Sequence, residues 1–439
     1  MQKLPAVSNL DAARAYFRRA RETHPELCEW AYLLHQPGAG TCWTGIGAHR
    51  IVHYTGDRFE IHTDGEKTAR PAGTDIFREL RPLLDPSLPC FFLVSLDIRR
   101  AARDPSLPLM SFVQPKVEAC FGDAAPALLA AAPGLEEAAR DLIERDDTAP
   151  LPAICAKGNA NASPWQGEDD AHFLERLKRA VETLQSVHGK MIITRTYHRP
   201  APADADAFRL FEIYSDFEAN AAACHYAALG GINSLGCSPE NVFEMNGSEL
   251  AFDVVASTRG ISTDPEQDAR WLNELLTDAK ERKEHGMALE RYQKRMERLC
   301  QAGSVRLERH MDVRTLRHVR HLFSRVSGTL KEGMDCFDML HDSYPPLSSY
   351  PDELIPLADA GTEPTRYYGG MVGRIGPGWQ DACCYLNLRA ALVQDGGIHT
   401  QGGVGVIRES IPRQELLEVV NKLRSLKEAV SAWENEKSN

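Results

Sequence analysis

Two pairs of glutamates are spaced so that each pair lies on one face of a helix. Glu281 and Glu284 belong to one predicted helix, and Glu415 and Glu418 belong to another near the end of the chain. Side chains three residues apart on a helix have Cβ atoms about 5–6 Å apart. Each pair alone also fits an ordinary solvated helix face. If the two helices face each other, the four carboxylates could surround a cation.

A glycine-rich segment, GGVGVIRES, leads from a predicted strand into the helix that carries the second pair. Backbone N–H groups of such a turn, together with a helix N-terminus, favour an anion. Magnesium is usually held by one or two protein carboxylates with substrate oxygens and water. These segments therefore favour a magnesium site beside an anionic substrate.

Three more polar residues lie on or near predicted strands. Arg389 alternates with an apolar face in YLNLRAALV, Lys190 heads a strand, and Glu240 follows a proline. Arginine at such a position is either a surface residue or a bidentate clamp for a carboxylate. Lys190 also suits a plain strand end, and Glu240 a turn cap. The residues alone leave both interpretations open.

Missing motifs exclude several other kinds of site. The chain has no paired Cys or His spacing for zinc, no G-x-x-x-x-G-K-[ST], and no G-x-G-x-x-G between a strand and a helix. Cys237 has no base identifiable from the sequence, so a cysteine nucleophile is not supported.

Charge and cysteine usage limit the partners and the compartment. The 439 residues include 50 lysines and arginines against 62 acids, a net charge of −12, which disfavours nucleic acid and anionic membranes. Eleven cysteines without a regular spacing fit reduced thiols. No segment is typical of a signal peptide or a membrane span. We expect a cytoplasmic protein with no nucleic-acid and no membrane partner.

The elements that must position these residues come in mixed blocks. Alternating runs with Gly-containing turns predict antiparallel hairpins, while apolar stripes predict helices at 12–22 and 171–187, a long helix around 271–299, and a final helix beginning near Pro412. The segments AFRLFEIYSDF and YLNLRAALV are predicted as strands. This order favours an α+β fold with a large antiparallel sheet flanked by helices.

Eight segments together resemble the chorismate-utilising enzymes, a family that includes anthranilate, aminodeoxychorismate, isochorismate and salicylate synthases. The resemblance covers about 165–430 with every segment in family order, and the N-terminal hairpins and chain length resemble the salicylate synthases more weakly. No segment resembles a glutamine amidotransferase, so no fused glutaminase is expected. The segments are KMIITR, GCSPENVF, ASTRG, DAKERKEHG, HVRHLFSRVSGTL, YYGGMVG, LNLRAAL and GGVGVIRESIPRQELLEVVNK.

The resemblance implies one large fold of the type seen in anthranilate synthase component I. Residues 1–146 would form an N-terminal helix and β-hairpin region of that fold, 147–170 a linker rich in Pro, Ala, Asn and Gly, and 171–435 the chorismate-binding catalytic region. A monomer or a homodimer is expected.

The resemblance also assigns the charged groups. Glu284 and Glu418 match magnesium ligands, with Glu281 and Glu415 as near or water-mediated partners, and the Mg²⁺ ion would hold the ring carboxylate of chorismate. Lys190 matches the general base that activates water at C2, where ammonia-using relatives usually have glutamine. For lysine to act as a base near neutral pH, its pKa must fall, which burial and a nearby cation can supply.

Other positions match groups that contact the substrate. Glu240 matches the general acid that protonates the departing C4 hydroxyl, and His321 the histidine near the ring. The residues matched to substrate binding are Ala256, Ser257, Thr258, Tyr368, Arg389, Gly403, Gly405 and Lys422.

Two departures from the family pattern lie near the expected substrate. Ser257 stands where a glycine is usual, and YPPLSSYPDEL replaces a longer loop that contains glycine. Both bear on the substrate pose and the product. A serine here would add a hydroxymethyl group where backbone should approach the ring.

The expected activity is magnesium-dependent conversion of chorismate to isochorismate, with pyruvate elimination to salicylate as a further step in the same site, for siderophore or other secondary metabolite biosynthesis. One alternative is an aminating enzyme of the anthranilate or aminodeoxychorismate type that uses free ammonia. The other is a non-catalytic relative that binds a chorismate-like ligand or a partner protein. The pairing of Lys190 with Glu240 argues against the non-catalytic alternative, because binding alone needs no acid and base.

Overall fold

The computed structural model describes residues 8–100, 102–144, 164–202 and 205–438. Its first part is mostly β-structure with one long helix at the start. The elements are α1 (Asn9–Thr23), β1 (Trp30–Gln36), β2 (Thr41–Tyr54), β3 (Arg58–Thr63), β4 (Glu66–Pro71), α2 (Ile76–Leu80), β5 (Cys90–Val94), β6 (Met110–Phe121), β7 (Ala127–Ala131) and α3 (Glu136–Glu144).

The second part alternates hairpins with the longer helices. The elements up to the middle of this part are β8 (Gln166–Gly167), α4 (Asp170–Ser186), β9 (Met191–Pro200), α5 (Ala207–Phe217), β10 (Ala223–Leu229), β11 (Ile232–Ser238), β12 (Asn241–Asn246), β13 (Glu249–Gly260), α6 (Pro265–Thr277) and α7 (Ala279–Leu299). The remaining elements are β14 (Arg306–Thr315), β15 (Val319–Thr329), α8 (Cys336–Ser343), α9 (Ile355–Asp359), β16 (Met371–Ile375), β17 (Asp381–Leu386), β18 (Ala390–Gln394), β19 (Gly397–Val406) and α10 (Pro412–Ser438).

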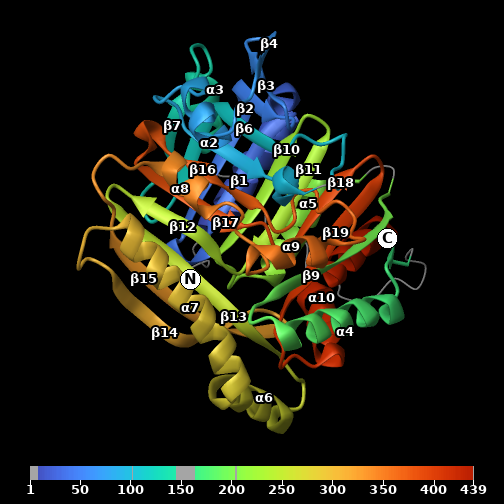
Figure 1. Ribbon diagram of the computed structural model, residues 1–439. Coiled ribbons are helices and arrows are strands. Elements are labelled where there is room, and N and C mark those ends of the chain that lie inside the picture. Colours follow the sequence, from blue (N-terminus) through green and yellow to red (C-terminus); the bar gives the residue numbers. More distant parts are fainter. Residues whose placement is uncertain (1–7, 101, 145–163, 203–204, 439) are drawn as a thin grey trace, which may run out of the picture.

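The strands join into one antiparallel network that helices cover from outside (Figure 1), which confirms the α+β prediction. Strands far apart in the sequence pair with each other: β1 with β10, β5 with β16, and β9 with β19. Helix α7 packs on β13 and β15, and α10 packs on β19, α4 and α5. The two helices with the glutamate pairs therefore lie on strands that also carry predicted site residues.

Several local predictions are confirmed. Helix α1 covers the predicted segment 12–22, and α4 covers the predicted segment 171–187 up to Ser186. The turns at 55–57, 64–65 and 246–247 join β2 to β3, β3 to β4 and β12 to β13, with left-handed glycines in each turn. Helix α10 begins at Pro412 as predicted.

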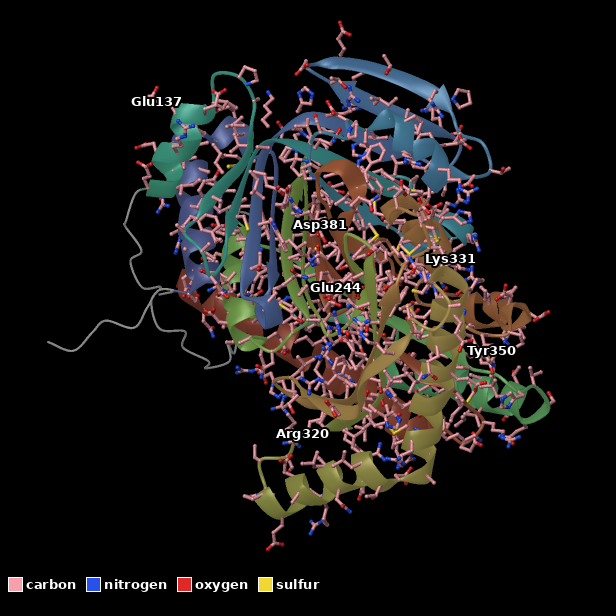
Figure 2. All side chains as sticks on the ribbon, turned by 90° about the vertical axis from the view of Figure 1, so that its left-hand side faces the viewer. Glu137, Glu244, Arg320, Lys331, Tyr350 and Asp381 are labelled. Atoms are coloured by element: carbon pink, nitrogen blue, oxygen red, sulfur yellow. The ribbon has the colours of Figure 1, made fainter. Side chains whose placement is uncertain are left out.

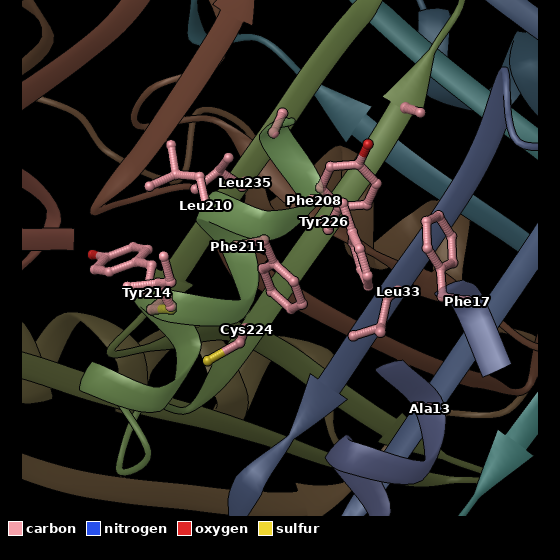
Figure 3. Packing of buried hydrophobic residues seen from close by; sticks show 14 of the residues in the cluster. Ala13, Phe17, Leu33, Phe208, Leu210, Phe211, Tyr214, Cys224, Tyr226 and Leu235 are labelled. Atoms are coloured by element: carbon pink, nitrogen blue, oxygen red, sulfur yellow. The ribbon is translucent and has the colours of Figure 1, made fainter. Parts of the chain in front are cut away.

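The segment AFRLFEIYSDF was predicted as a strand, and that prediction is wrong. It forms helix α5, whose N-terminus is capped by the Asp206 side chain, which accepts hydrogen bonds from the N–H groups of Phe208 and Arg209. Phe208, Phe211 and Tyr214 are packed in the core with residues of α1 and β10 (Figure 3). Its polar residues Arg209, Glu212 and Asp216 recur at helical spacing, and the strand prediction overlooked this pattern among the surrounding apolar residues.

The single long helix predicted around 271–299 is also wrong. The chain breaks at Asp278, which has an extended backbone and ends α6. The Asp278 side chain accepts hydrogen bonds from the N–H groups of Lys280 and Glu281 and so begins α7. This new start places both Glu281 and Glu284 in the first two turns of α7.

The segment YLNLRAALV is not one continuous strand. Residues 387–389 separate β17 from β18, and Arg389 has a positive φ of 50°. Asn387 is held in this bend, because its backbone N–H donates to Gly370 and its side-chain amide donates to the Tyr367 carbonyl. Because of this bend, the side chains of 387–389 do not alternate between two faces as in a strand. Arg389 is buried, with 5% of its surface exposed.

The predicted linker, 147–170, lies mostly outside the described residues. Its described end, 164–170, contains β8, which pairs with β9, and the first residue of α4. Within the described ranges, no helix is both long and apolar enough to cross a membrane.

Candidate active site

One cavity brings together most of the residues predicted for the site. Its walls come from β9, β13, β15, β19, α7 and α10 and from the bends before β16 and β18. Glu281 and Glu415 do not line the cavity, and both are buried next to it on the same helices as Glu284 and Glu418. The predicted residues that line it are Lys190, Glu240, Ala256, Ser257, Thr258, Glu284, His321, Tyr368, Arg389, Gly403, Gly405, Glu418 and Lys422.

Glu240 is a buried carboxyl group at the end of the β11–β12 turn. Its side chain accepts a hydrogen bond of 3.3 Å from the Val255 N–H, and burial raises its pKa to about 8. Arg314 holds the preceding turn, because its guanidinium donates to the Pro239 carbonyl and, at 3.1 Å, to Asp253. A carboxyl group that keeps its proton near neutral pH in a cavity is suited to act as a general acid.

We expect kcat to fall as pH rises through about 8, because Glu240 then loses the proton that it donates. The folded pKa lies above the ordinary value of 4.5, so the free energy of unfolding should fall as pH rises from about 4.5 to about 8, where only the unfolded carboxyl group is charged, and should level off above that range. A pH–rate profile and pH-dependent unfolding check both effects. The variant Glu240→Gln removes the acid. Its matched control is Glu244→Gln, which lies on β12 but outside the cavity. A flat wild-type profile through this range would contradict the role of Glu240.

His321 and Arg389 form a directly bonded pair. Arg389 Nη2 lies 2.5 Å from His321 Nε2, and Thr258 Oγ1 lies 3.0 Å from His321 Nδ1. Arginine can only donate, so Nε2 accepts and the ring proton lies on Nδ1, directed to Thr258. Burial and the Arg389 charge hold the pKa of His321 well below its usual range. The neutral histidine therefore orients Arg389 at the cavity wall.

Lys190 lies immediately before β9 and faces α7. Its Nζ donates to Glu284 at 3.0 Å. Burial disfavours the ammonium form, but the attraction of Glu284, Glu418 and Glu415 outweighs it and raises the pKa of Lys190. A general base at this position was expected to have a lowered pKa. In the protein without a bound cation the pKa of Lys190 is raised instead, because its nearest partners are carboxylates.

Each of the four glutamates already has a cationic partner. Glu281 bonds Arg259 at 2.7 Å, and Glu418 bonds Lys422 at 2.7 Å. Burial would raise the pKa of Glu284, but the neighbouring lysines lower it, whereas burial and the nearby Glu418 raise that of Glu415. As arranged here, no group of three or more His, Cys, Asp or Glu side chains among the described residues could hold a metal ion.

Lys280 is a charged residue of this region that was not singled out from the sequence. It lies four residues before Glu284 on α7, and its ammonium group is among the glutamates of α7 and α10. Its spacing from Glu284 was a usable signal, but the contact with α10 depends on how the two helices pack. Arg259 was missed for the same reason, since its contact with Glu281 joins β13 to α7.

Two glycines of β19 allow close approach of side chains. A Cβ on Gly405 would lie 1.9 Å from Lys190 Cε, and one on Gly403 would lie 3.0 Å from the Tyr368 hydroxyl. Burial raises the pKa of Tyr368, so its hydroxyl remains a neutral donor. Gly405 thus leaves the space that the Lys190 side chain occupies.

Ser257 lies at a bulge of β13 with a positive φ of 68°. Its hydroxyl donates to the Glu281 carbonyl in the first turn of α7 at 2.7 Å. The side chain therefore ties the bulge to the helix that carries Glu284. Left-handed backbone costs about 1–2 kcal/mol for a residue with a Cβ, and one hydrogen bond returns about 1 kcal/mol.

Ser257→Gly should change the KM for chorismate or the product ratio by about tenfold, equivalent to about 1.4 kcal/mol, because the bulge is released from α7. Relief of backbone strain should offset the lost hydrogen bond, so the free energy of unfolding should change little. Ser257→Ala keeps the Cβ and loses only the hydroxyl, which separates the two effects. Steady-state kinetics with product analysis checks this. Unchanged kinetics in both variants would contradict a role for the hydrogen bond between Ser257 and the Glu281 carbonyl.

The segment YPPLSSYPDEL, expected to replace a longer loop, contributes one residue to the cavity wall and contacts β9. Leu347 lines the cavity, and Tyr350, labelled in Figure 2, exchanges two backbone hydrogen bonds of 2.8 Å with Lys190. Ser349 accepts a hydrogen bond from the Ile192 N–H at 2.9 Å. The segment therefore fixes the backbone of the first residues of β9.

Comparison with known proteins places this geometry in a family. The family model for chorismate binding enzymes matches residues 30–428, so the chain belongs to this family. Anthranilate synthase component 1 of Thermus thermophilus is 30% identical over 414 residues, which are 89% of each chain. The same component of Streptomyces coelicolor is 33% identical over 60% of this chain, and the chain covers about half (52%) of its length.

The fold is shared with a solved isochorismate synthase. The menaquinone-specific isochorismate synthase of Escherichia coli superposes with a TM-score of 0.68 at 19% identity, covering 98% of this chain and 92% of that one. The expected fold class is thereby confirmed. A solved anthranilate synthase component I from Streptococcus pneumoniae superposes with a TM-score of 0.70 at 17% identity, covering 88% of this chain and 92% of that one, so the names of the structural neighbours state two different reactions.

Proposed function

We propose that this protein converts chorismate to isochorismate in a magnesium-dependent reaction, with pyruvate elimination to salicylate as a further step in the same site. The product would enter siderophore or other secondary metabolite biosynthesis. The observation that carries the proposal is the presence in one cavity of Lys190, a potential base, and Glu240, an acid that keeps its proton. A glutamine at 190, as in ammonia-using relatives, would lack a base for water.

The proposed chemistry is an exchange of hydroxyl groups around the ring. Lys190 removes a proton from water as its oxygen bonds to C2, the ring double bonds shift, and the C4–O bond breaks. Glu240 donates its proton to the departing hydroxyl, which leaves as water. One water enters and one leaves, so the reaction is an isomerisation. Arg389, oriented by His321, would bind the enolpyruvyl carboxylate with Tyr368.

The residue types suit magnesium, because Glu284 of α7 and Glu418 of α10 both line the cavity and magnesium prefers oxygen ligands, but both side chains must turn from their present lysine partners to bind the ion. Glu284 and Glu418 would hold the ion, with Glu281 and Glu415 as their partners. When bound, magnesium would neutralise the ring carboxylate of the substrate and anchor it. If Glu284 bound the magnesium ion, Lys190 would lose the carboxylate partner that keeps it protonated.

The test is incubation of the purified protein with chorismate and Mg²⁺, with and without ammonium, and identification of the products by mass. Isochorismate or salicylate without ammonium supports the proposal. The second candidate is amination with free ammonia, favoured by the anthranilate synthase relatives, and it predicts an aminated product that needs ammonium. No turnover of chorismate or isochorismate would favour a non-catalytic relative.

A further inference from the structure

Lys280 is placed between the two helices that carry the glutamates. Its Nζ lies 3.5 Å from Glu281 Oε1, 3.8 Å from Glu284 Oε2 and 3.5 Å from Glu415 Oε1. The first two partners are on α7 and the third is on α10. One ammonium group therefore contacts three of the four carboxylates proposed to hold or support magnesium.

Lys280 differs from the other two lysines of this region in its access to the cavity. Lys190 and Lys422 both line the cavity, whereas Lys280 does not. The Lys280 side chain is 26% exposed, so it has a route to solvent. Its displacement therefore removes no group from the cavity wall.

A divalent ion and an ammonium group compete for these carboxylates at close range, because the two cations repel each other and both bind carboxylate oxygens. In the protein alone, Lys280 offsets the repulsion between Glu284 on α7 and Glu415 on α10. An ion that binds them must displace that charge, and the displacement lowers the observed metal affinity.

We propose that Lys280 is an internal counter-ion that competes with magnesium for these carboxylates. It stabilises the metal-free protein and moves aside when the metal binds. The inference rests on the proposed magnesium site, but it concerns binding of the ion and not the reaction that follows. It makes the unusual prediction that removing a charged residue from the site improves metal binding.

The experiment measures Mg²⁺ binding by titration calorimetry without substrate. Lys280→Met should bind Mg²⁺ at least about tenfold more tightly than wild type, equivalent to about 1.4 kcal/mol. In chelator the melting temperature of Lys280→Met should lie below that of wild type. Added Mg²⁺ should raise the melting temperature of the variant by more than it raises that of wild type. Lys280→Arg keeps the charge and should behave as wild type in calorimetry.

The matched control is Lys283→Met on the same helix. Lys283 pairs with Glu409 and does not line the cavity, so its loss should leave Mg²⁺ affinity unchanged. Equal or weaker Mg²⁺ binding by folded Lys280→Met would overturn the proposal, as would absence of Mg²⁺ binding in every variant. Absent chorismate turnover with the affinity shift intact would reject the proposed reaction and leave the counter-ion role standing.

Discussion

Lys190→Gln should lower the rate of water addition at C2 by about 10³-fold, within the range of about 10²–10⁴ that general-base catalysis contributes. Glutamine has a similar length but cannot accept a proton. The Lys190 Nζ is fixed by Glu284 at 3.0 Å and occupies the space beside Gly405, so no other base is in the same position. The loss should therefore appear in kcat.

The measurement follows isochorismate formation by wild type and Lys190→Gln at saturating chorismate. Elimination from supplied isochorismate could survive in the variant, which separates a lost base from a misfolded site. Lys422→Gln is a useful comparison, because this lysine also lines the cavity but bonds Glu418 and the Gly403 carbonyl. If wild type gives an aminated product with ammonium salts and no hydroxylated one, Lys190 does not select water.

Glu284→Gln should reduce turnover by at least about 10²-fold, the size of effect seen when support of a bound metal is lost. Glu284 is the carboxylate closest to Lys190 and also contacts Lys280, so the change removes a proposed ligand and leaves two partly exposed ammonium groups less well paired. Glu418→Gln, on the facing helix, should have a comparable effect.

Steady-state assays with Mg²⁺ and with excess chelator test this prediction, and circular dichroism confirms folding. Glu409→Gln is the control, because Glu409 pairs with Lys283 outside the cavity. Full wild-type activity in excess chelator would exclude the magnesium requirement and with it the assigned role of both glutamates.

The fold class could be predicted because hairpin turns and amphipathic stripes are local signals. Asn246 and Gly247 form the turn that their sequence predicts. Helix α5 was missed although Arg209, Glu212 and Asp216 recur at helical spacing, because the apolar and largely aromatic residues between them also fit a buried strand. The break at Asp278 has a local cause, a capping side chain, yet the apolar stripes on both sides of it concealed the boundary.

The members of the site were found from the order of sequence segments, but their electrostatic state depends on packing. Which cation pairs with which glutamate is decided by how α7 and α10 face each other, and no local pattern contains that information. The Lys190 pKa illustrates this, because three carboxylates from two helices raise it. Arg389 likewise needed the bend at 387–389 to meet His321.

The pairing of early with late strands affects how the chain folds during synthesis. Strand β5 pairs with β6 and with β16. The edge of β5 that pairs with β16 stays uncovered from the synthesis of Val94 until Met371 has been added to the chain. At about 5–20 residues per second, that delay on the ribosome is on the order of tens of seconds. Strand β5, buried along its whole length in the finished protein, is meanwhile an open apolar edge. Nascent chains should therefore depend on chaperones, and fragments that end before β16 should aggregate.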